Sequence, residues 1–565
     1  MMAPEALPVR GILLLFILAF LGVGVQLTAT LHGVGISPDS TRYVAAARNL
    51  AGGRGLQVLG PDAELEPLAL WAPLYPVVLS IPTRIGLDAV PAARYLNAFL
   101  FAANILLVGL LTSRQPKVPR WAALLASAAF LFSPDIAYVH AWLWTEPMSI
   151  FAGFLGLLLV DHGLITGDWR AFIFAAFFLS TSYLLRYAGL AFAVTGVAGV
   201  AFFQEQDGRP YRWGRTALFL LLTFLPMALW GYATQSLSGK AIGRSLSIHP
   251  EELAAMARVL PVVSDWFLPG RIGPAIRLWA AGVALAFGGV VGVVLIVRRA
   301  FFTEKNPRSG RSRMTELLTL FVFCYASMLA LARVLFLPPA PISARILTLP
   351  YTALLVVGIG LAASGFARLK SRLNARPKFG WTWLPLTLLS SSLFILWLGL
   401  NLTHTLKWTS SVSAQGMGYA GVSWSESILI RYLRDLPEDT LIYTNGPDAV
   451  YILTGKDSRM LPSWPSDSSP TATDIPISIR RMRDELLLQG GVVAYFRGIT
   501  WRANLSEPQL KRVLPLEPLL GNEDGSIYAV EAEGRTREGN KESRHGRMYD
   551  RLLSHFVKLR RTDEG

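Results

Sequence analysis

The chain has 565 residues, of which 52% are hydrophobic and only 16% are charged, with a formal net charge of +15. Apolar runs long enough to cross a bilayer recur through the first four hundred positions, which excludes a soluble globular protein and indicates a polytopic membrane protein. Most basic clusters lie in short connections between these runs, as positive-inside orientation requires, so the charge does not indicate a nucleic-acid partner.

The apolar runs predict about eleven membrane crossings. With their flanks they cover residues 11–31, 92–112, 121–134, 147–165, 171–184, 188–203, 214–233, 276–297, 315–336, 344–364 and 381–403. The first run is too long for a secretory signal core, so we interpret it as a retained signal anchor. The basic connections all fall on one side of this count, at residues 114–120, 209–215, 298–313 and 368–378. That side should be the cytoplasm, which places the N-terminus inside and everything after about residue 404 outside.

The first outer loop, residues 32–91, carries the most informative segment of the sequence. Its residues 37–50 follow directly on the first apolar run and include the carboxylate of Asp39. An amphipathic pattern puts Tyr43, Ala47 and Leu50 on one face, which predicts a helix along the membrane surface. Prolines break the apolar stretch 70–87, so that stretch should form a re-entrant or interfacial piece rather than a span.

After about residue 404 the composition becomes that of a soluble domain. Buried strands are predicted at 441–443, 492–496 and 527–530, with helices near 424–436, 447–454 and 475–489. The predicted fold is therefore an α-helical polytopic membrane protein with a small C-terminal α/β extracytoplasmic domain. Its parts are a transmembrane domain at 1–403, the extracytoplasmic domain at 404–534 and a charged tail at 535–565.

Two carboxylates are candidates for chemistry, and each has a plain structural alternative. Asp39 could act at the membrane interface, or it could cap the helix expected at 40–51 by accepting a backbone N–H. Glu146 stands at the outer end of a predicted span beside Trp142 and Trp144, and the sequence Thr145-Glu146-Pro147 also suits the first turn of a helix.

Two arginines interrupt apolar stretches near the expected outer leaflet. Arg186 and Arg345 would each cost a few kcal/mol at such depth unless paired, so a partner or an anionic ligand is expected. Arg345 has no obvious carboxylate nearby in the sequence. Snorkelling to headgroups or a structural ion pair is the alternative, whereas two guanidiniums could grip a phosphate bidentately. Arg333 and Lys240 are weaker candidates of the same kind.

The sequence lacks several motifs of nucleotide-binding and metal-dependent enzymes. It contains no GxxxxGK[ST] phosphate loop, no HExxH and no Cys/His cluster with metal-ligand spacing. These absences disfavour a nucleotide-powered pump.

The order of several short motifs resembles the polytopic membrane glycosyltransferases of the GT-C class. The similar branch includes lipid A aminoarabinose transferase, protein O-mannosyltransferases and Rgt-type lipopolysaccharide core transferases. The motifs are residues 39–43 with 49–51 and 55–56, 72–76, 94–98, 145–147, 185–190, Arg345 followed by Pro350, and 443–448 with Tyr451 and 453–456. One departure is Ala72, where the family often has a first proline.

The resemblance implies an inverting transfer on the outer face of the plasma (inner) membrane. The donor would be a sugar linked to polyprenyl phosphate, the acceptor a lipid, glycan or protein of the cell envelope, and the catalytic carboxylate the acid of the first outer loop, here Asp39. Glu146 is the second catalytic candidate, Arg186 and Arg345 would bind the donor phosphate, and Tyr43 and Tyr187 are weaker substrate-binding candidates. No cofactor is implied with certainty, although some relatives bind a divalent metal ion near their acidic residues.

Two other classes of function compete with this one. A transporter or flippase of a lipid-linked or anionic solute would also need intramembrane arginines and outer carboxylates. The lack of detectable repeated halves and the long, acid-bearing first outer loop argue against it. A non-enzymatic envelope protein whose outer domain binds a partner is the second rival.

Overall fold

A computed structural model describes residues 8–203, 209–239, 245–267, 273–301, 312–337, 339–374, 383–463, 476–502 and 504–530. The chain divides into two compact units, which we describe separately. The helical unit contains the residues up to 34 and residues 67–414, and the sheet unit contains residues 35–66 and those from 415 onward. The first outer loop therefore divides between the units, and its first half belongs with the C-terminal part of the chain.

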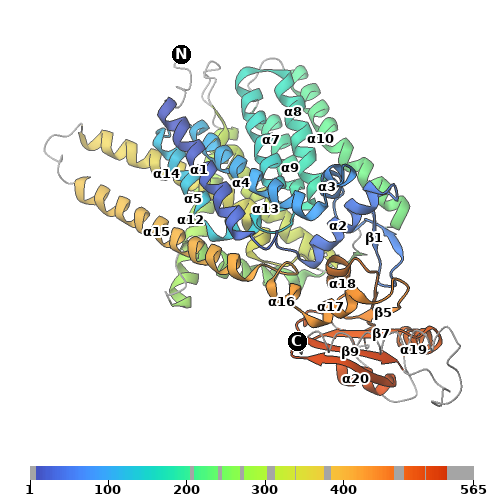
Figure 1. The fold of residues 1–565 in the computed structure, drawn as a ribbon. Helices are drawn as coiled ribbons and strands as arrows, with labels where there is room; N and C mark the ends of the chain where they lie inside the picture. Colours follow the sequence, from blue (N-terminus) through green and yellow to red (C-terminus); the bar gives the residue numbers. More distant parts are fainter. Residues whose placement is uncertain are drawn as a thin grey trace, which may run out of the picture. The chain divides into compact units, whose positions relative to one another are not determined.

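The helical unit is built almost entirely of α-helices (Figure 1). They are α1 (Val9–Ala29), α3 (Leu74–Arg84), α4 (Ala89–Arg114), α5 (Trp121–Leu131), α6 (Pro134–His140), α7 (Glu146–Thr166), α8 (Trp169–Leu185), α9 (Leu190–Phe203), α10 (Arg209–Ser238), α11 (Val259–Phe267), α12 (Pro274–Phe301), α13 (Met314–Leu335), α14 (Ala344–Asn374) and α15 (Trp383–Gln415). Two 3₁₀ segments, η1 (Tyr187–Gly189) and η2 (Pro250–Arg258), and the short antiparallel pair β3 (Ser245–Leu246) and β4 (Phe336–Leu337) complete it.

The apolar runs expected to cross the membrane are helical, which confirms a mostly helical, multi-pass membrane protein, but among the described residues fewer helices than the expected eleven are long enough to cross. Within the described ranges, eight helices are long and apolar enough to cross a bilayer, or up to nine if the bent pair α5 and α6 counts as one span. That pair bends by 64° at its break, and α8 and α9 are shorter apolar helices. The proline-containing stretch forms only α3, a helix of 11 residues, so it is too short to span.

The helices of this unit pack closely around α7. A Cβ atom added at Gly153 would lie 2.4 Å from the ring of Phe192, and one at Gly156 would lie 2.7 Å from Leu179. Phe192 in turn stacks on Phe321 of α13, with ring centroids 4.0 Å apart. Small residues that let helices approach closely are the usual means of packing spans, because lipid provides no hydrophobic drive between them.

The sheet unit contains a five-stranded mixed sheet in the order β6-β5-β7-β9-β8. Its strands are β5 (Ile442–Thr444), β6 (Arg459–Met460), β7 (Val492–Phe496), β8 (Leu516–Asn522) and β9 (Gly525–Val530), with helices α16 (Val422–Ser425), α17 (Ile428–Asp435), α18 (Pro447–Thr454), α19 (Ile477–Gln489) and α20 (Glu507–Val513). The strands β5, β6 and β7 run parallel, and β9 pairs antiparallel with β7 and β8. Alternate residues of β7 enter two apolar cores, Val492 on the face covered by α17 and Val493 on the face covered by α19.

Part of the first outer loop packs onto this sheet unit. It supplies α2 (Pro38–Ala51), β1 (Gln57–Leu59) and β2 (Leu65–Pro67), and α2 contacts α18. Backbone hydrogen bonds fix both ends of the segment, from Tyr419 N–H to Ile36 O (2.9 Å) and from Met460 N–H to Pro61 O (2.8 Å). We expected the face of α2 with Tyr43 and Ala47 to lie along the membrane surface. Both side chains are instead buried by protein, so this prediction is wrong.

The predicted elements of the C-terminal domain are largely confirmed. Strands appear at all three predicted places, and the helix predicted at 424–436 is divided into α16 and α17. The strands β6 and β8 and the helix α20 were not predicted. The charged tail, residues 535–565, lies outside the described residues.

Candidate active site

Glu146 is the first residue of α7 and is completely buried. The positive end of the helix dipole stabilises a carboxylate in this position. Thr145 is the N-cap residue, but its side chain makes no capping bond and instead donates to Oε2 of Glu146 (3.4 Å). Glu146 therefore does lie in the first turn of a helix, as the structural alternative predicts.

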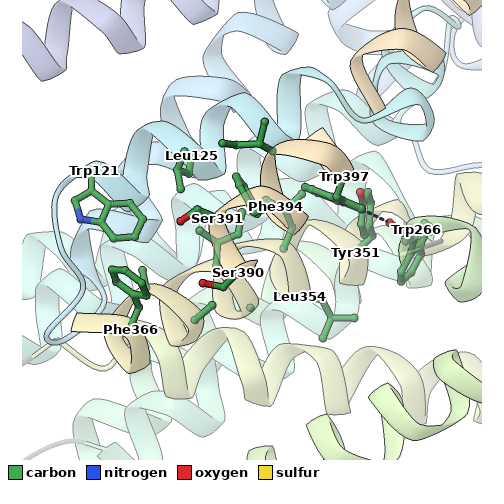
Figure 2. A pocket seen from close by; sticks show the side chains of 16 residues that line it. Trp121, Leu125, Trp266, Tyr351, Leu354, Phe366, Ser390, Ser391, Phe394 and Trp397 are labelled. Carbon is green, nitrogen blue, oxygen red and sulfur yellow. Dashed lines mark hydrogen bonds between the residues drawn. The ribbon is translucent and has the colours of Figure 1, made fainter. Parts of the chain in front are cut away.

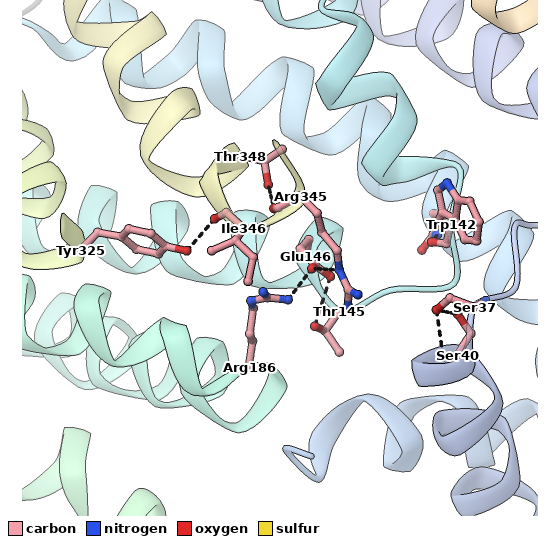
Figure 3. A network of polar contacts seen from close by, with 11 residues as sticks. Ser37, Ser40, Trp142, Thr145, Glu146, Arg186, Tyr325, Arg345, Ile346 and Thr348 are labelled. Carbon is pink, nitrogen blue, oxygen red and sulfur yellow. Dashed lines mark hydrogen bonds and ion pairs between the residues drawn. The ribbon is translucent and has the colours of Figure 1, made fainter. Parts of the chain in front are cut away.

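Arg186 and Arg345 both bind the same carboxylate oxygen, Oε1 of Glu146, and they reach it from different elements (Figure 3). Arg186 has an extended backbone between α8 and η1, and Arg345 lies in the first turn of α14. Their side chains are 14% and 20% exposed, whereas Glu146 is not exposed at all. Two guanidiniums therefore share one carboxylate oxygen at a nearly buried site. The missing local partner of Arg345 is therefore Glu146, which lies 199 residues away in the chain.

An aromatic pair holds Arg345 on its other side. The guanidinium carbon lies 4.0 Å from the centroid of the Trp144 ring, a cation–π distance. Trp144 is itself stacked on Trp142, with centroids 4.8 Å apart and an interplanar angle of 11°. Arg345 thus has a fixed orientation between a carboxylate and an indole face.

Backbone contacts stabilise the turn that carries Arg345. Tyr325 on α13 donates to Ile346 O (2.5 Å), and Thr348 donates to Arg345 O (2.7 Å). On the opposite side of the carboxylate, Nε of Arg186 is buried and has no hydrogen-bond partner among the described residues. A guanidinium with a spare buried donor is suited to bind a further oxygen anion.

The structure places Asp39 in the sheet unit, in the first turn of α2. The helix begins at Pro38 and its cap is Ser37, which exchanges hydrogen bonds with Ser40 in a capping box (3.0 and 3.3 Å). The alternative that Asp39 is the N-cap of the helix is therefore wrong. The position remains favourable for an ionised carboxylate because it lies at the positive end of a helix.

The weaker candidates lie in several places. Tyr187 donates to Ala69 O (3.1 Å) and accepts a hydrogen bond from Trp230 Nε1 (3.2 Å). Arg333 is buried, pairs with Glu252 and donates to Ala340 O, so the fold already neutralises it. Tyr43 is buried in α2, and Lys240 lies outside the described residues.

A second buried carboxylate cluster was not singled out from the sequence. Asp448 in α18 accepts a hydrogen bond from Tyr419 (2.6 Å) and pairs with Arg502 (2.8 Å). Arg42 of α2 lines the same small cavity, of about 30 Å³. In the sequence, Asp448 belongs to the motif at 443–448, but that motif does not indicate that Tyr419 and Arg502 are its partners.

An apolar cavity of about 710 Å³ is present in the helical unit (Figure 2). Residues of α5, α14 and α15 line most of it, and Trp266 closes part of its wall, stacked on Tyr351 at 4.4 Å and accepting a hydrogen bond at its carbonyl from Trp397. None of the described residues that line it carries a carboxylate or a cation. The cavity therefore offers room for hydrocarbon but no groups for acid–base chemistry.

The acids of the described ranges do not form a metal site. No group of three His, Cys, Asp or Glu side chains that could hold a metal ion occurs among the residues that the structure describes. Glu146 also has both oxygens engaged, one by two arginines and the other by Thr145. Glu146 therefore has no oxygen left over to bind a divalent ion.

No protein-family model matches the chain, and no curated protein matches it. Solved structures do match. ArnT from Cupriavidus metallidurans bound to undecaprenyl phosphate matches over 93% of this chain and 99% of that chain, with a TM-score of 0.55 and 12% identity. Its apo state matches over 92% and 98%, with a TM-score of 0.57 and 12% identity. The chain has the GT-C fold.

At 12% identity the match establishes the GT-C fold, and it leaves the sugar and the acceptor undetermined. A more distant match is the archaeal oligosaccharyltransferase AglB from Archaeoglobus fulgidus in complex with an inhibitory peptide and a dolichol-phosphate. It has a TM-score of 0.46 and 12% identity over 86% of this chain and 69% of that chain. The expected GT-C fold is confirmed by the two ArnT matches alone.

Proposed function

We propose that this protein transfers a sugar from a polyprenyl-phosphate carrier to an acceptor of the cell envelope. The observation that carries the proposal is the buried trio of Arg186, Glu146 and Arg345, in which two guanidiniums share one carboxylate oxygen. The ArnT structure of the same fold, which contains undecaprenyl phosphate, supports this class of donor.

The two arginines would bind the donor phosphate and stabilise it as it leaves. Polyprenyl phosphate gains negative charge on its bridging oxygen when the bond to the sugar breaks. Guanidiniums that are already oriented and shielded from water stabilise such charge more strongly than they would in solution. Trp144 and Glu146 fix the plane of Arg345, so little reorganisation is needed at the moment of reaction.

Glu146 would position the arginines rather than remove a proton. Both guanidiniums bind its Oε1, and a carboxylate held by two cations is a poor base. Its removal would leave two buried arginines facing each other. We therefore assign the catalytic candidate Glu146 a positioning role.

We propose that Asp39 acts as the general base. Because Ser37 caps α2, the carboxylate of Asp39 is not needed for that purpose. In the proposed step the acceptor oxygen attacks the anomeric carbon and its proton passes to Asp39. The bond between that carbon and the phosphate oxygen breaks with its electron pair remaining on the phosphate. A single displacement of this kind inverts the anomeric configuration.

The proposed orientation follows from the basic loops. Arginine- and lysine-rich connections favour the cytoplasmic side, which puts the N-terminus inside and the sheet unit outside the plasma membrane. The donor would then be consumed on the outer face, where nucleotide sugars are absent.

The experiment is a transfer assay with the full chain in lipid nanodiscs. Polyprenyl-phosphate sugars are added one at a time with an envelope extract, and release of polyprenyl phosphate is measured. We expect release with at least one donor, and its loss in Arg345→Ala. Donor movement across proteoliposomes without loss of the sugar would contradict the proposal and favour a flippase.

A further inference from the structure

Asp448 lies in the first turn of α18 and is only 7% exposed. Its Oδ2 accepts a hydrogen bond from Tyr419 at 2.6 Å, and its Oδ1 pairs with Nη1 of Arg502 at 2.8 Å. All three residues belong to the sheet unit. A buried carboxylate with both oxygens engaged is a fixed element of the structure.

Arg42 of α2 faces the same carboxylate. It lines the small cavity together with Asp448 and Arg502, and its guanidinium donates to Leu59 O. Burial lowers the pKa of Arg42, and the charge of Arg502 lowers it further, whereas the charge of Asp448 is the strongest influence in the opposite direction. Asp448 therefore compensates two guanidiniums, one from the first outer loop and one from the C-terminal part of the chain.

A second contact links the same two helices. Arg48, six residues after Arg42 on α2, lies over the ring of Tyr451 on α18 at 5.8 Å. The helix that carries Asp39 is thus attached to α18 at two places along its length. Since α2 has only 14 residues, it would be marginally stable without such contacts.

We infer that Asp448 is a positioning residue that holds α2, and with it Asp39, through Arg42. The inference rests on the proposed function for its catalytic consequence only. Asp448 contacts Arg502 and Tyr419, lines the same small cavity as Arg42 and is not assigned to substrate. Its role is to set where the carboxylate of Asp39 lies.

Loss of the charge on Asp448 would remove the strongest attraction on Arg42 and leave it beside the like charge of Arg502, with only the weaker attraction of Glu66 and Asp39 in compensation. Like charges this close repel, so α2 would move away from α18 or lose order. A displacement of about 1 Å in a reacting group can reduce the rate by about 100-fold. The donor-binding residues of the helical unit would keep their contacts with one another.

The test compares Asp448→Asn with Asp484→Asn, which removes an exposed aspartate of α19 in the same unit. Hydrogen exchange of peptides covering residues 38–51 and 492–496 is measured, together with kcat and KM for the donor. For Asp448→Asn we expect exchange in 38–51 to accelerate about tenfold and kcat to fall about 10- to 100-fold, with KM changed less than twofold. Asp484→Asn should match the wild type, and Asp448→Glu should recover part of kcat.

Unchanged exchange in residues 38–51 of Asp448→Asn would overturn the inference, as would accelerated exchange with normal kcat. If that variant loses protection in 492–496 as well, the sheet itself has unfolded, and Arg42→Gln then tests the same contact from the side of α2. Normal exchange in a folded Arg42→Gln would equally overturn it. If the wild type transfers no sugar, the proposed function fails, while the exchange measurement still decides whether Asp448 holds α2.

Discussion

Arg345 pairs with Glu146 although 199 residues separate them in the chain, and the same carboxylate oxygen also binds Arg186. This arrangement decides between two interpretations of the arginines. They are paired rather than snorkelling, and two guanidiniums share a single carboxylate oxygen. A structural ion pair and a phosphate site are therefore compatible here.

Replacing Glu146 should destabilise the helical unit more than any exposed substitution. In Glu146→Ala both guanidiniums lose their buried partner, and removal of one member of a buried pair typically costs about 3–5 kcal/mol. We expect a lower thermal midpoint for Glu146→Ala in detergent, and a smaller decrease for Glu146→Gln. Glu426→Gln, which changes an exposed glutamate, is the control. Equal midpoints for Glu146→Ala and Glu426→Gln would show that the trio does not stabilise the fold.

The indole of Trp144 should contribute to donor binding through Arg345. Cation–π contacts contribute about 0.5–2 kcal/mol, so Trp144→Leu should weaken binding of polyprenyl phosphate by about 2- to 30-fold. Trp169→Leu, at a more exposed tryptophan of the same unit, should leave the affinity unchanged. A Trp144→Leu variant with normal affinity would mean that Glu146 alone orients the guanidinium.

Much of the fold could be predicted because apolar runs and buried strands leave strong local signals. The strand β7 is such a run, whereas β8 contains Pro518 and lies at the edge of the sheet with a register shift after it. Proline weakens a strand pattern, and edge strands tolerate it. The helix α20 has only seven residues, too few to show a helical period.

The candidate site was predictable only in its parts. Each member of the trio was recognisable as a charged residue in an apolar context, but a contact across 199 residues has no local signal. The sequence also allowed Asp39 to be the N-cap of α2. A serine two positions earlier can cap equally well, and in the structure Ser37 does so through reciprocal hydrogen bonds with Ser40. The link between α2 and Asp448 likewise depends on tertiary packing.

Acid should loosen the sheet unit through Glu485. Burial alone would raise the pKa of this carboxyl, but hydrogen bonds from Tyr443, Arg481 and Arg459 outweigh it and hold the pKa below its ordinary value. The stabilisation is present above the unfolded pKa and is lost as the pH falls through the folded one. The protection factors of residues 477–489, which compare measured with intrinsic amide exchange at each pH, should therefore fall between about pH 5 and pH 3. Glu485→Gln should reduce that dependence, and an identical pH profile would contradict the assignment.

Asp39→Asn should abolish most transfer without harming the fold. General-base catalysis contributes about 10²–10⁴-fold to a rate, and asparagine keeps the shape of the side chain. Because Ser37 caps α2, we expect an unchanged thermal midpoint. Transfer and thermal stability measured on the same preparation check both statements. A stable variant with near-normal turnover would remove Asp39 from the catalytic step.

The most direct test of the central claim is the affinity of the full chain for undecaprenyl phosphate, measured in nanodiscs for wild type and for Arg345→Ala. Loss of a hydrogen bond between charged groups costs about 1.5–3 kcal/mol, which predicts about 10- to 100-fold weaker binding. Arg345→Lys should recover only part of the affinity, because the planar fork is lost. Arg368→Ala, at an exposed arginine of the same helix, should bind as the wild type does. Unchanged affinity in a folded Arg345→Ala would contradict the assignment of the trio as the phosphate site.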